Sequence, residues 1–76
     1  MTEVVWMEIF SDNLKDAMED AGFNLRMLAD ESGLSISTIS KYINKQQMPG
    51  VKALVNIAYA LGIEVEDLVP HADVIR

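Results

Sequence analysis

Four single glycines divide the chain, and three of them follow stretches whose apolar residues recur at helical spacing. The clearest stripe comprises Phe10, Leu14, Ala17, Met18 and Ala21. Gly22 follows this stripe, and Gly33 and Gly62 follow two later ones. Glycine readily adopts the left-handed conformation that ends a helix. Apolar stripes that are each followed by a glycine therefore predict an all-α protein.

The apolar stripes and the residues that begin and end them predict five short helical elements in a compact bundle. The expected elements are a helix from about Ser11 as N-cap to Gly22, one capped by Asn24 that ends near Ser32, one capped by Ser35 that runs from Ile36 to about Asn44 or Lys45, one from about Pro49 to Gly62, and a short turn over 66–69. Ser and Asn are favoured caps because their side-chain oxygens accept from free backbone amides. Residues 10–69 would form the domain, with an apolar and acidic segment at 1–9 and a tail at 70–76.

The size and composition favour a single small cytoplasmic domain. A chain of 76 residues has room for one core, and without cysteine it must rely on packing alone. The absence of cysteine fits a reducing compartment. Neither a positively charged amino-terminal leader nor an apolar run near the ~18 residues of a membrane span is present, so secretion and membrane insertion are not expected.

The charge distribution is uneven. The net charge is -6, which by itself disfavours a nucleic-acid partner, yet no Asp or Glu occurs from Ser32 to Ile63. Lys41, Lys45 and Lys52 all fall in this acid-free window. The gap is either an accident of a short stretch or a surface kept free of negative charge, and its length favours the second interpretation.

Residues suited to enzymatic chemistry are sparse. The single histidine, His71, lies near the carboxyl terminus, and the glycines form no phosphate-binding loop. Glu64, Glu66 and Asp67 are better explained as acids that favour the positive end of a short helix. The sequence therefore predicts no catalytic residue, no metal and no cofactor.

The second and third expected helices are joined by the turn ESGLS, which is the layout of a helix-turn-helix. The stretch GFNLRMLADESGLSISTISKYINKQQMP followed by VKALVNIAYALGIEVEDLV resembles the Cro/repressor-type family of phage and bacterial regulators. The resemblance covers residues 10–69. It implies a lambda-repressor-like five-helix bundle and a sequence-specific DNA-binding transcriptional regulator, specifically a repressor of the phage or mobile-element type.

The resemblance also assigns roles to individual residues. Base edges in the major groove would be read by Ile36, Ser37 and Lys41. Phosphate contacts would come from Asn24, Ser35, Ser40, Asn44, Lys45, Gln46 and Gln47. Ile36 can pack on a thymine methyl group or belong to a protein-binding patch, and each of the polar residues can equally be an ordinary solvated side chain.

The expected partner is double-stranded DNA carrying a palindromic operator, bound by a homodimer. The start of the chain carries more apolar residues than the first helix needs for its core face, namely Val4, Val5, Trp6 and Ile9. They can form the dimer contact, as can the carboxy-terminal turn, or they can fold onto the domain's own core. The alternative function is that of a protein-interaction module, such as an antitoxin, whose acidic first helix binds a basic partner.

One departure from the family pattern concerns the core. Related proteins often carry an Arg late in the first helix and a Glu near the end of the third, which form a buried ion pair. Met18 and Ile43 occupy these two positions here. Replacing both charges with apolar groups avoids a stranded buried charge, so we expect the two side chains to touch.

Overall fold

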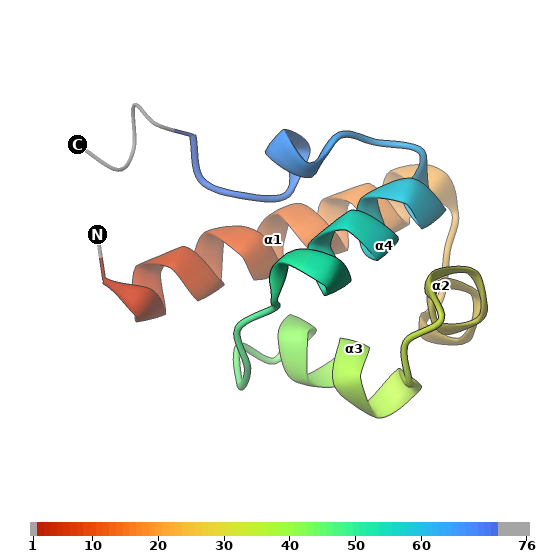
Figure 1. The fold of residues 1–76 in the computed structure, drawn as a ribbon, viewed down its shortest axis with the longest axis horizontal. Helices are drawn as coiled ribbons and strands as arrows, with labels where there is room; N and C mark the ends of the chain where they lie inside the picture. Colours follow the sequence, from red (N-terminus) through yellow and green to blue (C-terminus); the bar gives the residue numbers. More distant parts are fainter. Residues whose placement is uncertain (1, 72–76) are drawn as a thin grey trace.

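The computed structural model describes residues 2–71 as four α-helices and one turn of 3-10 helix (Figure 1). The elements are α1 (Glu3–Ala21), α2 (Leu25–Ser32), α3 (Ile36–Ile43), α4 (Val51–Leu61) and η1 (Val65–Asp67). The all-α prediction is confirmed. The count of five helices is wrong, because the expected fifth element is only the short turn η1, and Pro70 follows it too closely for a helix to continue.

The first helix begins earlier than the sequence pattern suggested. Thr2 is its N-cap, and the Val5 amide donates to the Thr2 hydroxyl oxygen at 3.2 Å. Ser11, which was predicted to be the N-cap, is fully buried in the middle of α1. The prediction was wrong because the apolar positions at Trp6 and Phe10 continue the stripe backwards by one further turn.

Residues 3–9 form the first two turns of α1. The Trp6 ring lies 5.6 Å from the Phe10 ring, measured between centroids, and packs against the core. Val4 and Val5 remain exposed. Of the alternatives open for this segment, folding onto the core therefore holds for Trp6.

The first two helices end at the glycines that the sequence predicted. Gly22 and Gly33 adopt φ values of 71° and 76°, and each donates a backbone hydrogen bond to the preceding helix. A side chain would strain the backbone in this conformation. These local signals fix where α1 and α2 stop, and hence the sharp turn into α3.

The core lies between the four helices: α1 packs against α3 and α4, and α2 also packs against α3 and α4. The fully buried apolar side chains are Phe10, Leu14, Leu28, Ile39, Ile57 and Leu68. Leu68 comes from the segment after η1, and the Asn13 side-chain amide donates to its carbonyl at 3.1 Å. Within the described residues, no helix is long and apolar enough to cross a membrane.

Candidate nucleic-acid interface

Side-chain caps set the geometry of the helix-turn-helix formed by α2 and α3. The Met27 amide donates to the Asn24 side-chain oxygen at 2.8 Å, and the Thr38 amide donates to the Ser35 hydroxyl oxygen at 3.0 Å. Between the helices, the Ser32 hydroxyl oxygen accepts from the Leu34 amide at 3.3 Å. Both predicted caps are confirmed, and the turn between them is held by short-range hydrogen bonds.

The two faces of α3 have opposite character. Ile39 and Tyr42 are buried, and the Phe10 and Tyr42 rings meet edge to face with centroids 5.8 Å apart. Ile36, Ser37 and Lys41, which were predicted to read bases, are all exposed. The helix therefore directs the three candidate side chains away from the core, and it can enter a groove only with this face.

The end of α3 is closed by a Schellman motif with an unusual residue. The Lys45 amide donates to the Tyr42 carbonyl at 3.2 Å and the Gln46 amide donates to the Lys41 carbonyl at 2.8 Å. Lys45 has a φ of 61° and is the only non-glycine residue with a positive φ between residues 2 and 71. Glycine is the usual residue at this position, so a lysine here is held in an unfavourable backbone conformation.

The residues predicted to contact the DNA backbone differ in which side-chain hydrogen-bond donors are available to a phosphate. Ser35 donates its hydroxyl proton to the Thr38 hydroxyl at 2.8 Å, so this proton is already engaged. Ser40 is half-buried and accepts from the Asn44 side-chain amide at 3.3 Å. The Asn24 cap uses the side-chain oxygen and leaves the amide nitrogen as the donor. Gln46 and Gln47 are exposed in the loop after α3.

One acidic residue lies beside this surface. The Asp12 carboxylate of α1 lies 4.0 Å from the Lys45 ammonium, and both side chains are largely exposed. Sequence reasoning missed this neighbour, because the two residues are far apart in the chain and no local pattern links them. Lys45 therefore already has an anionic partner within the chain.

A groove lies at the junction of α1, α2 and α3. Its lining residues are Lys15, Met18, Glu19, Phe23, Asn24, Leu25 and Ile43, and its volume is about 480 Å³. Met18 is buried and Ile43 is half-buried against the core. Asn24 therefore lines the same groove as Ile43, the last residue of α3.

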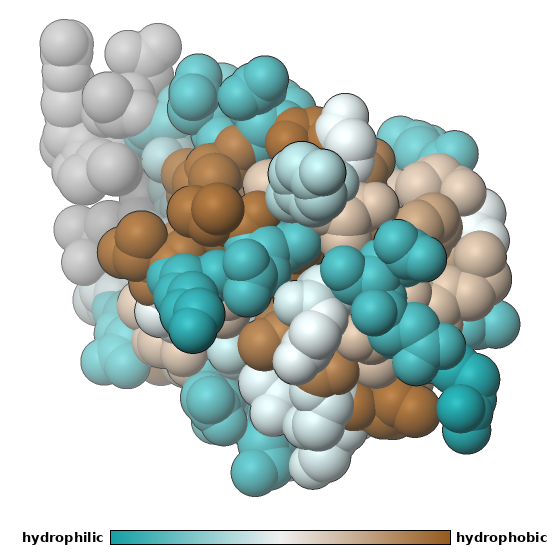
Figure 2. Space-filling view, turned by 45° about the vertical axis from the view of Figure 1, so that its right-hand side comes forward, coloured by the Kyte–Doolittle hydropathy of each residue, from teal (hydrophilic) through white to brown (hydrophobic). Residues whose placement is uncertain are grey.

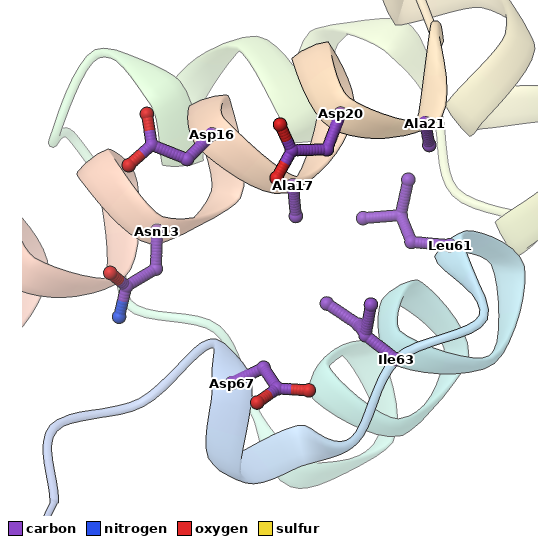
Figure 3. Close-up of a pocket in the computed structure, with 8 residues that line it drawn as sticks. All are labelled: Asn13, Asp16, Ala17, Asp20, Ala21, Leu61, Ile63 and Asp67. Atoms are coloured by element: carbon purple, nitrogen blue, oxygen red, sulfur yellow. The ribbon is translucent and has the colours of Figure 1, made fainter.

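A second hollow, of about 360 Å³, lies between α1 and η1. Ala17, Leu61 and Ile63 point into it, and Asp16, Asp20 and Asp67 are among the residues that line it (Figure 3). No basic residue lines this hollow, and none of the described residues forms a cluster of three or more potential metal ligands. Its negative charge makes it unsuitable for phosphate, which leaves α3 and its loop as the candidate DNA surface.

The match to a known family agrees with this geometry. Residues 14–68 match the family HTH_3, whose description is helix-turn-helix. The chain belongs to this family. The matched range contains α2, α3 and α4 in full, and the resemblance inferred from the turn and the last two helices is confirmed. No curated protein matches the chain.

Solved structures of regulators share the fold. The restriction-modification controller protein C.AhdI from Aeromonas hydrophila is 26% identical over 82% of this chain and 94% of its own, with a TM-score of 0.78. The clp gene regulator ClgR from C. glutamicum is 27% identical over 82% of this chain and 80% of its own, with a TM-score of 0.75. The hypothetical transcription factor NHTF from Neisseria, at 19% identity, covers 99% of this chain and 86% of its own with a TM-score of 0.83, and it supports the fold alone.

Proposed function

We propose that the protein is a sequence-specific DNA-binding transcriptional regulator without enzymatic activity, and that it acts in the cytoplasm as a repressor of the phage or mobile-element type. The observation that carries the proposal is the exposed, acid-free outer face of α3. Ile36, Ser37 and Lys41 lie on it, and α3 is the second helix of the helix-turn-helix, the one that enters the major groove in proteins of this architecture.

In the proposed complex with operator DNA, residues on either side of the outer face of α3 contact phosphates. Lys45, Gln46 and Gln47 extend from the loop after α3, and Asn24 lies at the amino end of α2, where the helix dipole favours an anion. The operator is a palindrome, because one small domain makes few base contacts and two copies place their helices about one turn of DNA, ~34 Å, apart. Occupancy of the operator then excludes other proteins.

A selection from random duplex DNA at low salt tests the proposal, followed by titration of the selected duplex at several salt concentrations. With few basic side chains, we expect about three to five phosphates neutralised per protomer, each contributing about -0.9 to the salt slope. Lys41→Ala should reduce discrimination between sequences, whereas Lys45→Ala should weaken binding to all duplexes alike. Failure to enrich any duplex would overturn the proposal.

The acidic hollow favours a second candidate function, binding of a basic protein partner as in an antitoxin. Asp16 and Asp20 of α1 and Asp67 of η1 line it together with apolar side chains. An arginine or lysine side chain from a partner would complement both the charge and the apolar lining. Asp16→Asn together with Asp20→Asn should weaken capture of such a partner and leave the selected DNA duplex bound at least as tightly.

A further inference from the structure

The carboxyl end of α3 is held to α1 by two neighbouring buried side chains. The Ile43 carbonyl accepts from the Ser11 hydroxyl at 2.6 Å, and the Tyr42 ring meets the Phe10 ring edge to face with centroids 5.8 Å apart. Phe10 and Ser11 are both fully buried. Two consecutive residues of α1 thus contact the last two residues of α3.

The hydrogen bond from Ser11 is the directional part of this contact. Among the described residues, it is the only hydrogen bond that joins α1 to α3. Met18 and Ile43 occupy the positions at which related proteins often carry an ion pair between these helices. Apolar packing is non-directional, whereas a hydrogen bond requires a narrow range of distances and angles. Ser11 can therefore orient α3 where the two apolar side chains cannot.

α3 is a short helix that is fixed by a tight turn at its start only. Its eight residues span about 12 Å, residues 33–35 join its start to α2, and the longer loop 44–50 follows its end. Ile36 and Ser37 lie next to the tight turn, and Lys41 lies one helical turn further on. A tilt of α3 about its start therefore displaces Lys41 while Ile36 and Ser37 stay nearly in place.

The outer face of α3 offers few groups to a base pair, so each group must be placed accurately. In Figure 2, the surface at the bottom of the molecule, where α3 lies, mixes pale residues of intermediate hydropathy with hydrophobic and hydrophilic ones. A hydrogen bond to a base edge weakens steeply when its angle is poor, whereas the flexible Lys45 side chain can follow a phosphate. The angle of α3 therefore affects discrimination between sequences more than general attraction to DNA.

We propose that Ser11 is a positioning residue for base recognition. Through the Ile43 carbonyl it holds α3 at one angle to the scaffold. At this angle, Ile36, Ser37 and Lys41 reach the base edges of one site together. The inference rests on the proposed DNA-binding function and deepens it, because it assigns part of the sequence specificity to a fully buried residue of α1.

The test compares Ser11→Ala with the wild-type chain on two duplexes. One is the duplex that the wild-type chain selects from random DNA, and the other is a scrambled duplex of equal length. The ratio of the two affinities should fall about fivefold or more, which is the worth of one misplaced base contact. The salt slope on the scrambled duplex should stay the same, because the phosphate contacts are kept. An unchanged ratio would overturn the proposal.

The ratio of affinities separates positioning from a loss of stability. A partly unfolded variant binds both duplexes more weakly by the same factor, so its ratio is unchanged. Asn13→Ala is the matched control, because the Asn13 amide donates to the Leu68 carbonyl at 3.1 Å and thus ties α1 to the segment after η1. This variant should keep the ratio. If it lowers the ratio as much as Ser11→Ala does, the effect is not specific to α3 and the proposal is wrong.

A double variant asks whether Ser11 acts through the reading face of α3. In the Lys41→Ala background, Ser11→Ala should lower the ratio less than in the wild-type chain, because the contact that it misplaces is already absent. Full additivity of the two changes would contradict the proposal. If circular dichroism shows that Ser11→Ala is unfolded, Ser11→Cys replaces it, since the thiol has a similar size and is a weaker donor. The same direction of change is expected.

Failure of this inference can be distinguished from failure of the proposed function. A wild-type chain that enriches no duplex would overturn both. A wild-type chain that discriminates between the two duplexes, together with Ser11→Ala that discriminates equally well, would overturn the role of Ser11 and leave the regulator proposal standing.

Discussion

The Ser11 hydroxyl donates a 2.6 Å hydrogen bond to the Ile43 carbonyl, which joins the middle of α1 to the last residue of α3. Ser11 is fully buried, and carbonyls at the end of a helix lack a partner within that helix. This bond therefore satisfies a helix terminus and a buried hydroxyl at once. It also fixes the carboxyl end of the proposed reading helix to the scaffold.

Removing that hydroxyl should destabilise the fold. Ser11→Ala leaves the Ile43 carbonyl without this donor, and an unsatisfied buried polar group costs about 1–3 kcal/mol. Urea denaturation followed by circular dichroism measures the loss. Ser37→Ala, at an exposed position on α3, is the control and should change the free energy of unfolding by less than about 0.5 kcal/mol. Similar effects for the two variants would show that the buried bond contributes nothing specific.

Ser11 illustrates which hydrogen bonds can be predicted from the sequence and which cannot. Asn24 and Ser35 were correctly identified as caps because the amide that each accepts from is three residues away, within a local pattern. Ser11 has the same chemistry, but its partner is Ile43, which only the tertiary fold brings near. The proximity of Asp12 to Lys45 was unpredictable for the same reason.

An exposed apolar stripe on α4 could have been found from the sequence. Val51, Val55 and Tyr59 fall at a four-residue spacing that is offset from the core positions Leu54, Ile57 and Leu61. A helical projection separates these two faces. The positive φ of Lys45 could not have been found in this way, because lysine carries no signal for the left-handed conformation.

Replacing Lys45 should separate backbone strain from charge. Lys45→Gly relieves the left-handed conformation, worth about 1–2 kcal/mol, and loses an exposed ion pair worth at most about 1 kcal/mol. We therefore expect Lys45→Gly to be more stable than Lys45→Ala by about 1 kcal/mol in urea denaturation. Both variants should bind DNA equally weakly. Equal stability of the two variants would contradict a strained backbone at this position.

Asp12 should act as an internal competitor for Lys45. Asp12→Asn frees the Lys45 ammonium for a phosphate, and since exposed ion pairs contribute up to about 1 kcal/mol, DNA affinity should rise up to about fivefold. Asp16→Asn makes the same change in net charge on the same helix and is the control. Titration by fluorescence anisotropy compares them. If both variants gain affinity equally, only net charge matters and the ion pair has no specific role.

Alkaline pH should destabilise the protein through Tyr42. Burial disfavours the charged phenolate and raises the pKa of Tyr42 above its ordinary value of 10.0. Below the unfolded pKa both states keep the proton and the full stability is present. As the pH rises through the raised pKa of the folded state, that contribution is lost. Tyr42→Phe should flatten this part of the alkaline stability profile measured by urea denaturation. An unchanged profile would show that Tyr42 does not control it.

Met18 and Ile43 should be coupled through packing. Both line the groove between α1, α2 and α3, where related proteins often carry an ion pair, and their direct contact remains a prediction. Met18→Arg and Ile43→Glu should each destabilise by about 3–5 kcal/mol, because each places an unpaired charge against the core. The double variant should recover part of this loss by restoring a charge pair, and the coupling energy is read from a double-mutant cycle in urea.

Met18→Arg with Ile43→Gln is the control, since glutamine has a similar shape without the charge. If the glutamine pair recovers as much stability as the glutamate pair, or if the two losses simply add, the positions are not coupled by charge and the proposed replacement of an ion pair by apolar packing is wrong.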